Sequence, residues 1–436
     1  MLSLTPDQIL ALAPDDASRK AGQGLANAGK WVSAGRTDRA VWGECQGSGS
    51  KPYQTVADAG ALAFKCSCPS RKFPCKHGVG MLLYQVKDDA RFAANSTEPA
   101  WVSDWMDKRQ EKAAAPPAAK ADKPKDEAAQ AKRQAAREDK VNAGIDELSL
   151  WMKDAMRTGI MQLPEKGAQY FEEVARRLVD AQAGGLARMV RELGDINYFG
   201  ERWHTEALDG FARLHMAISG YQNIDKQDAA VAQELRNTIG FQQGADVLEG
   251  QPILPDTWFV AGSETDSEGA LTVEKHWLLS SEGRAGLLLQ YVPYGQRPGV
   301  NLFVGQSFQG EVQHYPAALP LRLSVRNPEI SKAPAQIPML ADWNEVAAQE
   351  SQHVAQWPLV RELPYAVAAL RPVKTPNGQW LIEDQNGRQM RLRDTARIWD
   401  WMALSGGNFL PTAVLGAEHA YRPLGLWFNN TYISLA

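Results

Sequence analysis

The chain has 436 residues, of which 44% are hydrophobic and 22% are charged. This is enough material for two to four domains, each with an apolar core of its own. The formal net charge of -4 and the pI of about 6.0 exclude a nucleic-acid binder that is basic over its whole surface. The charge is unevenly distributed, because residues 1–140 hold 22 Lys and Arg against 17 Asp and Glu, leaving 25 against 34 in the remainder.

The N-terminal residues and the length of the apolar runs indicate where in the cell the protein is expected. No apolar run approaches the roughly 18 residues that a membrane helix needs. The first ten residues, MLSLTPDQIL, lack the basic segment that begins a secretory signal. We therefore expect a cytoplasmic protein.

The cysteines are few and crowded together. All four, Cys45, Cys66, Cys68 and Cys75, fall within 31 consecutive positions. Four cysteines in a chain of this length do not make a disulfide scaffold. Their placement instead indicates a common use in one small region.

The N-terminal elements predict a small module. Residues 3–27 favour short helices, and residues 40–64 favour two short strands with turns at Gly47-Ser48-Gly49 and near Gly60. After the cysteine cluster, residues 78–86 carry apolar side chains at helical spacing. We predict an N-terminal module over residues 1–98, whose core at 41–84 is a treble-like ββα zinc unit.

A linker is predicted over residues 99–141. It begins with a short helix that contains Trp101 and Trp105. Residues 112–140 then contain no aromatic or branched aliphatic side chain, so this stretch cannot bury enough apolar surface to offset the entropy of ordering it. We expect a flexible linker with an extended first half, while residues 126–140 suit a solvated helix that runs into the next domain.

The remainder divides into a helical region, 142–245, and a β-rich region, 246–436. Four or five helices fit an antiparallel bundle, with breaks at Gly184-Gly185 and Gly194, and no convincing fixed-period repeat is present. After Pro252 the pattern changes to strands, including a hairpin around Asn386-Gly387, with helices inserted at 341–356 and 396–404. The predicted fold class is therefore α+β multidomain.

One motif carries chemistry: Cys66-Ser67-Cys68, six residues, then Cys75-Lys76-His77. Three thiolates and one imidazole complete a closed tetrahedral Zn²⁺ site and leave no position for a catalytic water, so one structural zinc ion is expected. Thiolates favour zinc over harder cations, and the spacing differs from iron–sulfur motifs. A redox dithiol or four incidental residues are the alternatives, and Cys45 is expected to be an ordinary strand thiol.

These residues resemble the SWIM zinc finger. Cys66-x-Cys68…Cys75-x-His77 matches the whole metal-binding pattern of that finger, and it lies between two predicted strands and a predicted helix, as in the finger. The segment WGECQGSGSKPY and the long C-terminal region look like the stand-alone bacterial SWIM proteins. The resemblance implies a DNA-binding or protein-binding finger. It also implies a genomic context of MoxR-type AAA+ ATPases and von Willebrand factor A-domain proteins.

The residues of the finger do not decide whether it binds nucleic acid or protein. Lys65, Arg71, Lys72 and Lys76 lie in and beside the metal loop, and no acidic residue occurs between positions 59 and 87. A rigid basic loop suits weak, sequence-independent contact with the DNA or RNA backbone. The same lysines could instead offset the charge of a Cys₃His zinc centre in a purely structural or protein-binding module.

No catalytic set is recognisable, because nucleophile elbows, phosphate-binding loops and H-E-x-x-H motifs are missing from the sequence. We therefore expect a non-enzymatic zinc-binding protein whose finger mediates nucleic-acid or protein interaction. The alternative is an adaptor for the ATPase and A-domain partners that the resemblance suggests, with zinc serving only to hold the fold.

Overall fold

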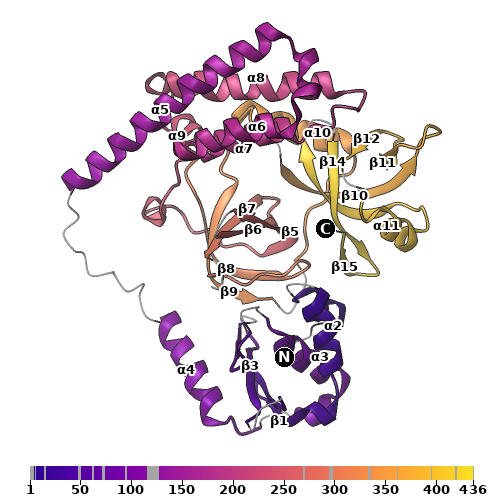
Figure 1. Ribbon diagram of the computed structural model, residues 1–436. Coiled ribbons are helices and arrows are strands. Elements are labelled where there is room, and N and C mark those ends of the chain that lie inside the picture. Colours follow the sequence, from indigo (N-terminus) through magenta and orange to yellow (C-terminus); the bar gives the residue numbers. More distant parts are fainter. Residues whose placement is uncertain are drawn as a thin grey trace.

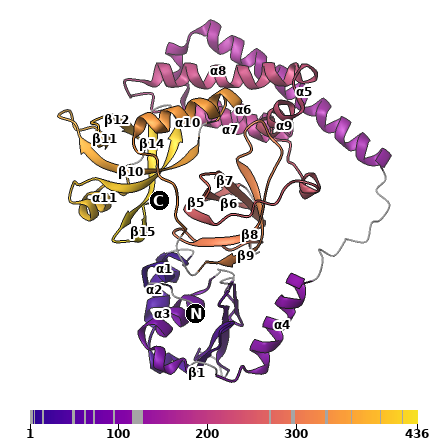
Figure 2. The same cartoon turned by 180° about the vertical axis from the view of Figure 1, so that it is seen from behind.

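The computed structural model describes residue 4 and residues 6–13, 16–47, 51–60, 63–70, 74–93, 96–114, 127–268, 271–293, 298–331, 335–360, 362–393, 395–417 and 420–435. Within these residues the chain forms an N-terminal module, a helical bundle and two β-barrels. Figures 1 and 2 show the module and the bundle on opposite sides of the barrels. Among the described helices, none is both long and apolar enough to cross a membrane.

The N-terminal module is an antiparallel sheet covered by helices. The sheet has the order β1-β2-β3-β4. Its elements are α1 (Pro6–Ala11), α2 (Asp16–Leu25), η1 (Ala28–Lys30), β1 (Trp31–Arg36), β2 (Ala40–Cys45), β3 (Tyr53–Asp58), β4 (Phe64–Cys66), α3 (Lys76–Lys87), η2 (Asp89–Arg91) and α4 (Ala100–Ala114). The sequence predicts only β2 and β3, because β4 has too few residues to show alternation and β1 is interrupted by Gly35. Ser48 and Gly49 of the predicted turn lie outside the described residues.

Helix α4, which contains the predicted Trp101–Trp105 helix, packs on this sheet. Val102 and Met106 are buried against Trp42 and Val56. Arg39 of the segment before β2 binds Glu98 at 2.6 Å and Asp107 at 2.7 Å, and Arg109 binds Asp58 at 3.1 Å. Apolar contact and ion pairs together tie α4 to the module. The prolines of the predicted linker, in residues 115–126, lie outside the described part of the chain.

The middle of the chain is the bundle that the sequence predicts. Its elements are α5 (Glu127–Thr158), η3 (Ile160–Gln162), α6 (Leu163–Asp180), α7 (Gly184–Gly194), α8 (Trp203–Gln222), η4 (Ile224–Lys226) and α9 (Ala229–Ile239). Helix α7 begins and ends at the predicted glycine breaks. A Cβ atom at Gly185 would lie 2.0 Å from the carbonyl oxygen of Thr238, so α7 and α9 can touch there only because the residue is glycine.

Two closed β-barrels follow. After η5 (Ala245–Leu248), barrel 1 has the order β5-β6-β7-β9-β8, from β5 (Trp258–Glu268), β6 (Leu271–Ser280), β7 (Ala285–Pro293), β8 (Ser307–His314) and β9 (Arg322–Ile330). Barrel 2 follows α10 (Trp343–Gln356). Its elements are β10 (Leu363–Lys374), β11 (Trp380–Asp384), β12 (Gln389–Leu392), α11 (Ile398–Ser405), β13 (Leu410–Ala417), β14 (Ala420–Phe428) and β15 (Thr431–Ser434).

The two barrels have the same topology. In barrel 2, β12-β11-β10-β13-β14 closes because β12 also pairs with β14. In both barrels the first three strands form an antiparallel meander, the first strand pairs with the fourth, and the third pairs with the fifth in parallel. Barrel 1 and barrel 2 therefore share one five-stranded topology.

The registers match residue by residue. Trp258 in barrel 1 and Leu370 in barrel 2 each pair with the last residue of the second strand and with the start of the fourth. The parallel pair Leu288–Leu323 corresponds to Leu392–Tyr421. The offset between copies is 112 positions at Trp258, 104 at Leu288 and 98 at Leu323. Because this offset changes from strand to strand, a fixed-period search of the sequence cannot find the repeat.

The barrels share an apolar interface. The outer face of the barrel 1 meander contributes Phe259, Ala261, Trp277 and Leu279, which pack against Ala366, Ala413, Leu415 and Leu424 of barrel 2. At its edge, Arg422 lies 4.9 Å over the ring of Trp277 and binds Glu264 at 2.9 Å. The connection between β8 and β9, residues 315–321, also reaches outward. Its Leu319 packs on the barrel 2 core, and its Pro316 carbonyl accepts a hydrogen bond from Gln243.

Helices α10 and α11 and the β11–β12 hairpin agree with the sequence predictions. Strand β10 is a strand that the sequence does not reveal. Eight of its twelve residues are buried, so apolar side chains do not alternate with polar ones, and Pro364 and Pro372 oppose a strand assignment.

The N-terminal module also contacts barrel 1, because Phe303, which lies between β7 and β8, packs against the module's core.

We predict that Trp277→Ala weakens the barrel interface. Trp277 is fully buried, and its truncation leaves a cavity, so the free energy of unfolding of the barrels should fall by about 3–5 kcal/mol. Urea unfolding followed by circular dichroism measures this change. Trp399→Ala is the matched control, because that side chain is 67% exposed and should change stability by about 0.5 kcal/mol or less. Equal effects of the two substitutions would contradict the interface.

We also predict a pH dependence for the attachment of α4. Arg39 and Thr37 hold the pKa of Glu98 below its ordinary value of 4.5. The stabilisation by Glu98 is therefore fully present above that value and is lost as pH falls through the depressed one. Thermal unfolding of the chain and of Glu98→Gln should differ at pH 7 and converge in acid. A difference that persists in acid, where Glu98 is protonated, would disprove this origin.

Candidate metal centre

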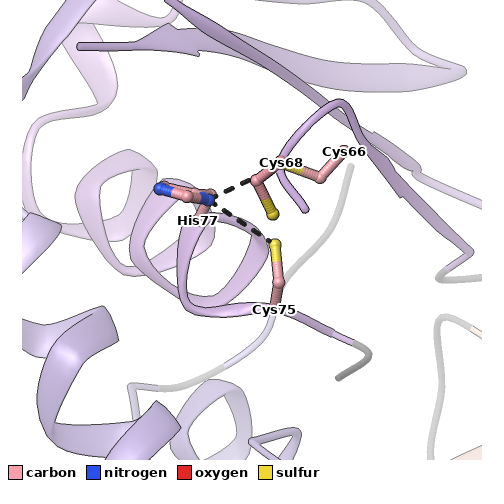
Figure 3. Close-up of side chains that lie close together, drawn as sticks. All are labelled: Cys66, Cys68, Cys75 and His77. Carbon is pink, nitrogen blue, oxygen red and sulfur yellow. Dashed lines mark hydrogen bonds between the residues drawn. The ribbon is translucent and has the colours of Figure 1, made fainter. Parts of the chain in front are cut away.

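The four predicted ligands come from two adjacent elements of the N-terminal module. Cys66 is the last residue of β4, and Cys68 follows in the next turn. Cys75 is the residue that precedes the first turn of α3, and His77 is the second residue of that helix. Figure 3 shows the thiols of Cys68 and Cys75 beside the imidazole of His77. The ligands thus join a sheet edge to a helix N-terminus.

Local backbone structure places both pairs. Strand β4 pairs with β3, and the amide of Ser67 donates to the Gln54 carbonyl at 2.9 Å, while the Gln54 amide donates to the Ser67 hydroxyl at 2.9 Å. These two bonds hold the turn between Cys66 and Cys68. Cys75 has extended backbone angles, φ -72° and ψ 167°, and its carbonyl accepts the first helical bond, from Val79.

The ligand atoms form a compact cluster. All four lie within 4.8 Å of one another. The Sγ atoms of Cys66 and Cys75 are 3.7 Å and 3.8 Å from Nδ1 of His77. In a tetrahedral centre with Zn–S of about 2.3 Å and Zn–N of about 2.0 Å, sulfur and nitrogen ligands stand about 3.5 Å apart. The observed separations need only a small contraction to enclose one zinc ion, bound by His77 through Nδ1.

Crowding of the thiols also points to a cation. The hydrogen bond with Cys75, together with burial, raises the pKa of Cys66 to about 12. Burial raises the pKa of Cys68 as well, whereas the Cys66 thiol, by donating to Cys75, lowers the pKa of Cys75. Three thiolates are therefore costly here without a positive charge between them. A zinc ion supplies that charge, and with four protein ligands its role is structural.

Two neighbours that the sequence does not reveal support the ligands. Thr55 lies opposite Cys66 in the sheet, and its hydroxyl is 3.2 Å from the Cys66 sulfur. The ring of Tyr53 lies 4.9 Å from the imidazole of His77. Such contacts orient ligands and tune their basicity. The pairing of β3 with β4 places both residues at the site, and a strand of three residues gives no sequence signal for that pairing.

The other residues considered from the sequence have different positions. The Cys45 thiol is fully buried in β2, outside the cluster of four. Lys65 and Lys76 are exposed beside the ligands. Arg71 and Lys72 lie outside the described residues, so the structure does not place half of the predicted basic set. Whether any of these four cations contacts nucleic acid stays a prediction.

Comparison with known proteins agrees with this site and with the bundle. Residues 61–85 match the SWIM zinc finger, and residues 136–239 match the SWIM-associated four-helix bundle domain. No curated protein and no solved structure matches the chain. The matched segments end before barrel 1 begins, so the two barrels lie outside both matches. Together with the cluster of Cys66, Cys68, Cys75 and His77, the finger match fits one structural zinc ion.

We predict that the purified chain contains one zinc ion and that Cys68→Ala removes it, because three ligands hold the ion far less tightly than four. Atomic emission gives the metal content, and limited proteolysis should then show cleavage within the N-terminal module. The bundle and barrels should resist cleavage, because their cores are separate from the core of the module. Cys45→Ala is the matched control and should retain one zinc ion. Equal zinc loss in both variants would contradict the ligand set.

Proposed function

We propose that this SWIM zinc finger protein, which joins its finger to a SWIM-associated four-helix bundle domain, acts non-enzymatically in the cytoplasm and binds nucleic acid through its zinc-held module. The four ligands of a closed zinc site leave no coordination position for a substrate or an activated water. The metal would therefore shape a binding surface and would not perform chemistry.

The charge of the module is the observation that carries this proposal. Residues 17–87 contain eleven Lys and Arg against three Asp and Glu. Of the three acidic side chains, Glu44 bonds to Ser33 and Asp58 is paired with Arg109. The cations that are described and exposed number seven: Arg19, Lys20, Lys30, Lys51, Lys65, Lys76 and Lys87. A Cys₃His zinc centre has a charge of about -1, so offsetting it accounts for only one of them.

Several of these lysines surround the metal-binding end of the sheet. Lys65 precedes Cys66, and Lys76 lies between Cys75 and His77. Burial raises the pKa of the Cys45 thiol. The positive charges of Lys76 and Lys30 both oppose that rise, so both ammonium groups lie near Cys45. Cations from η1 and α3 thus act at the same end of the sheet, as contact with a phosphate backbone requires.

The geometry favours backbone contact over base reading. In α3, the helix that follows the finger loop, all nine residues from His77 to Gln85 are buried in the module. A helix enclosed in this way cannot enter a DNA groove, where a recognition helix must expose side chains to the bases. We therefore expect little sequence preference.

The alternative function is an adaptor that holds protein partners, including the AAA+ ATPase and von Willebrand factor A-domain proteins that the resemblance suggests. One observation favours it: Phe199, between α7 and α8 of the bundle, is 98% exposed. An aromatic side chain in that position is typical of an interface anchor.

Salt dependence separates these functions. Replacement of Lys30, Lys65 and Lys76 by Ala should weaken binding to duplex DNA and reduce the slope of log affinity against log salt by about 2–3, because each phosphate contact contributes about 0.9. Fluorescence anisotropy across a salt series measures the slope. The matched control replaces Lys132, Lys140 and Lys153 of α5, which are equally exposed, and should leave the slope unchanged.

An unchanged slope in the finger variant would contradict nucleic-acid binding by the module. Affinity capture of the full chain after nuclease treatment then tests the adaptor. Recovery of a stoichiometric ATPase or A-domain protein, lost on Phe199→Ala, would favour that function.

A further inference from the structure

A pocket opens in the helical bundle where α5, α8, η4 and α9 meet. Its volume is about 400 Å³, which lies within the range of small-molecule sites. Helix α5 contributes Glu138 and Asp146 to its lining, α8 contributes Tyr221, η4 contributes Asp225 and α9 contributes Arg236. We call it the bundle pocket. It is separate from the zinc ligands and from the finger lysines, which belong to other elements.

The charge of the bundle pocket is mainly negative. Its three carboxylates face one guanidinium, that of Arg236, which is already engaged because it binds Glu138 at 2.7 Å and lies 4.3 Å over the ring of Phe241. The carboxylates of Asp146 and Asp225 are exposed and have no ion-pair partner among the described residues. A positively charged ligand therefore finds two carboxylates that nothing else neutralises.

One buried polar group in the pocket wall also has no partner. Tyr221 is 7% exposed and stacks on Phe241, and its hydroxyl makes no hydrogen bond to another described residue. Burial raises the pKa of Tyr221, and the charges of Arg236 and Glu138 act on that pKa in opposite directions. The hydroxyl therefore lies close to two charged side chains of the pocket. A ligand that donates to it would satisfy a group that is otherwise left without a bond.

The carboxylates of the pocket are too far apart for one metal ion. Among the described residues, the zinc ligands are the only group of three or more Cys, His, Asp or Glu side chains close enough to hold one. Separated carboxylates instead suit a ligand whose positive charges are themselves separated. Ile145, which is fully buried, and the half-buried Ile224 also line the pocket and offer apolar surface to the part of the ligand between its charges.

We propose that the bundle pocket binds an aliphatic polyamine. Its ammonium groups pair with Asp146 and Asp225, one of them donates to the Tyr221 hydroxyl, and its methylene groups lie against the two isoleucines. A lysine-rich peptide presents the same ammonium groups but separates them by a polar backbone, which fits the apolar lining less well. Nucleic acid is repelled by the same carboxylates.

Isothermal titration calorimetry with spermidine and the full-length protein, freed of nucleic acid, tests the site. One spermidine should bind per chain. Asp146→Asn and Asp225→Asn should each weaken binding severalfold and together about tenfold or more, because hydrogen bonds between charged groups are the strong ones. Tyr221→Phe keeps the ring on Phe241 and should weaken binding severalfold. Asp154→Asn, an exposed carboxylate of α5 outside the pocket, is the matched control and should leave the affinity unchanged.

Absence of spermidine binding, or equal affinities in all of these variants, overturns the proposal. Displacement of spermidine by an equal concentration of Mg²⁺ would show that the pocket only collects cations, and also overturns it. Binding of tetralysine in preference to spermidine, lost in the double Asp variant, would assign the pocket to a peptide instead. Each of these results leaves the finger proposal standing, because that proposal depends on the salt slope with duplex DNA.

Discussion

Coordination of one zinc ion by Cys66, Cys68, Cys75 and His77 is the interaction on which the N-terminal module depends. Strand β4 has only three residues, and it meets α3 through the ligands. Burial and mutual contact make the thiols unfavourable as anions, so the ligands can approach one another only when a cation compensates them. The same ion holds Lys65 and Lys76 on neighbouring elements. The distribution of positive charge on this module is therefore a consequence of metal binding.

A second constraint acts in the C-terminal half. Two five-stranded barrels of one topology have two equivalent outer faces, and a chain that leaves both apolar exposes one to aggregation. Here one face is buried between the copies, and its counterpart carries Arg371, Glu383 and Arg391 in place of apolar side chains. The pair of barrels is consequently asymmetric in chemistry although it is symmetric in topology.

The metal ligands could be predicted from the sequence because they are close in the chain, so their spacing alone reports the chemistry. Helices of the bundle were equally predictable, since apolar spacing and glycine breaks are local. The barrels could not be predicted from the sequence. Strand β10 is buried on both sides, and the sequence offset between equivalent residues of the two barrels changes from one strand to the next. Thr55 and Tyr53 escaped prediction for a related reason: they reach the metal through pairing with a strand too short to recognise.

The connection of residues 315–321 has a consequence for the order of the two barrels in the chain. In barrel 2 the corresponding strands are almost contiguous, since β13 ends at Ala417 and β14 begins at Ala420. The longer connection of barrel 1 contacts the core of barrel 2 through Leu319 and the segment after α9 through Gln243. Each barrel is thus specific to its place in the chain, although the two share one topology. A recombinant protein with the two barrels in reverse order would retain every strand and yet lose the contacts that assemble them.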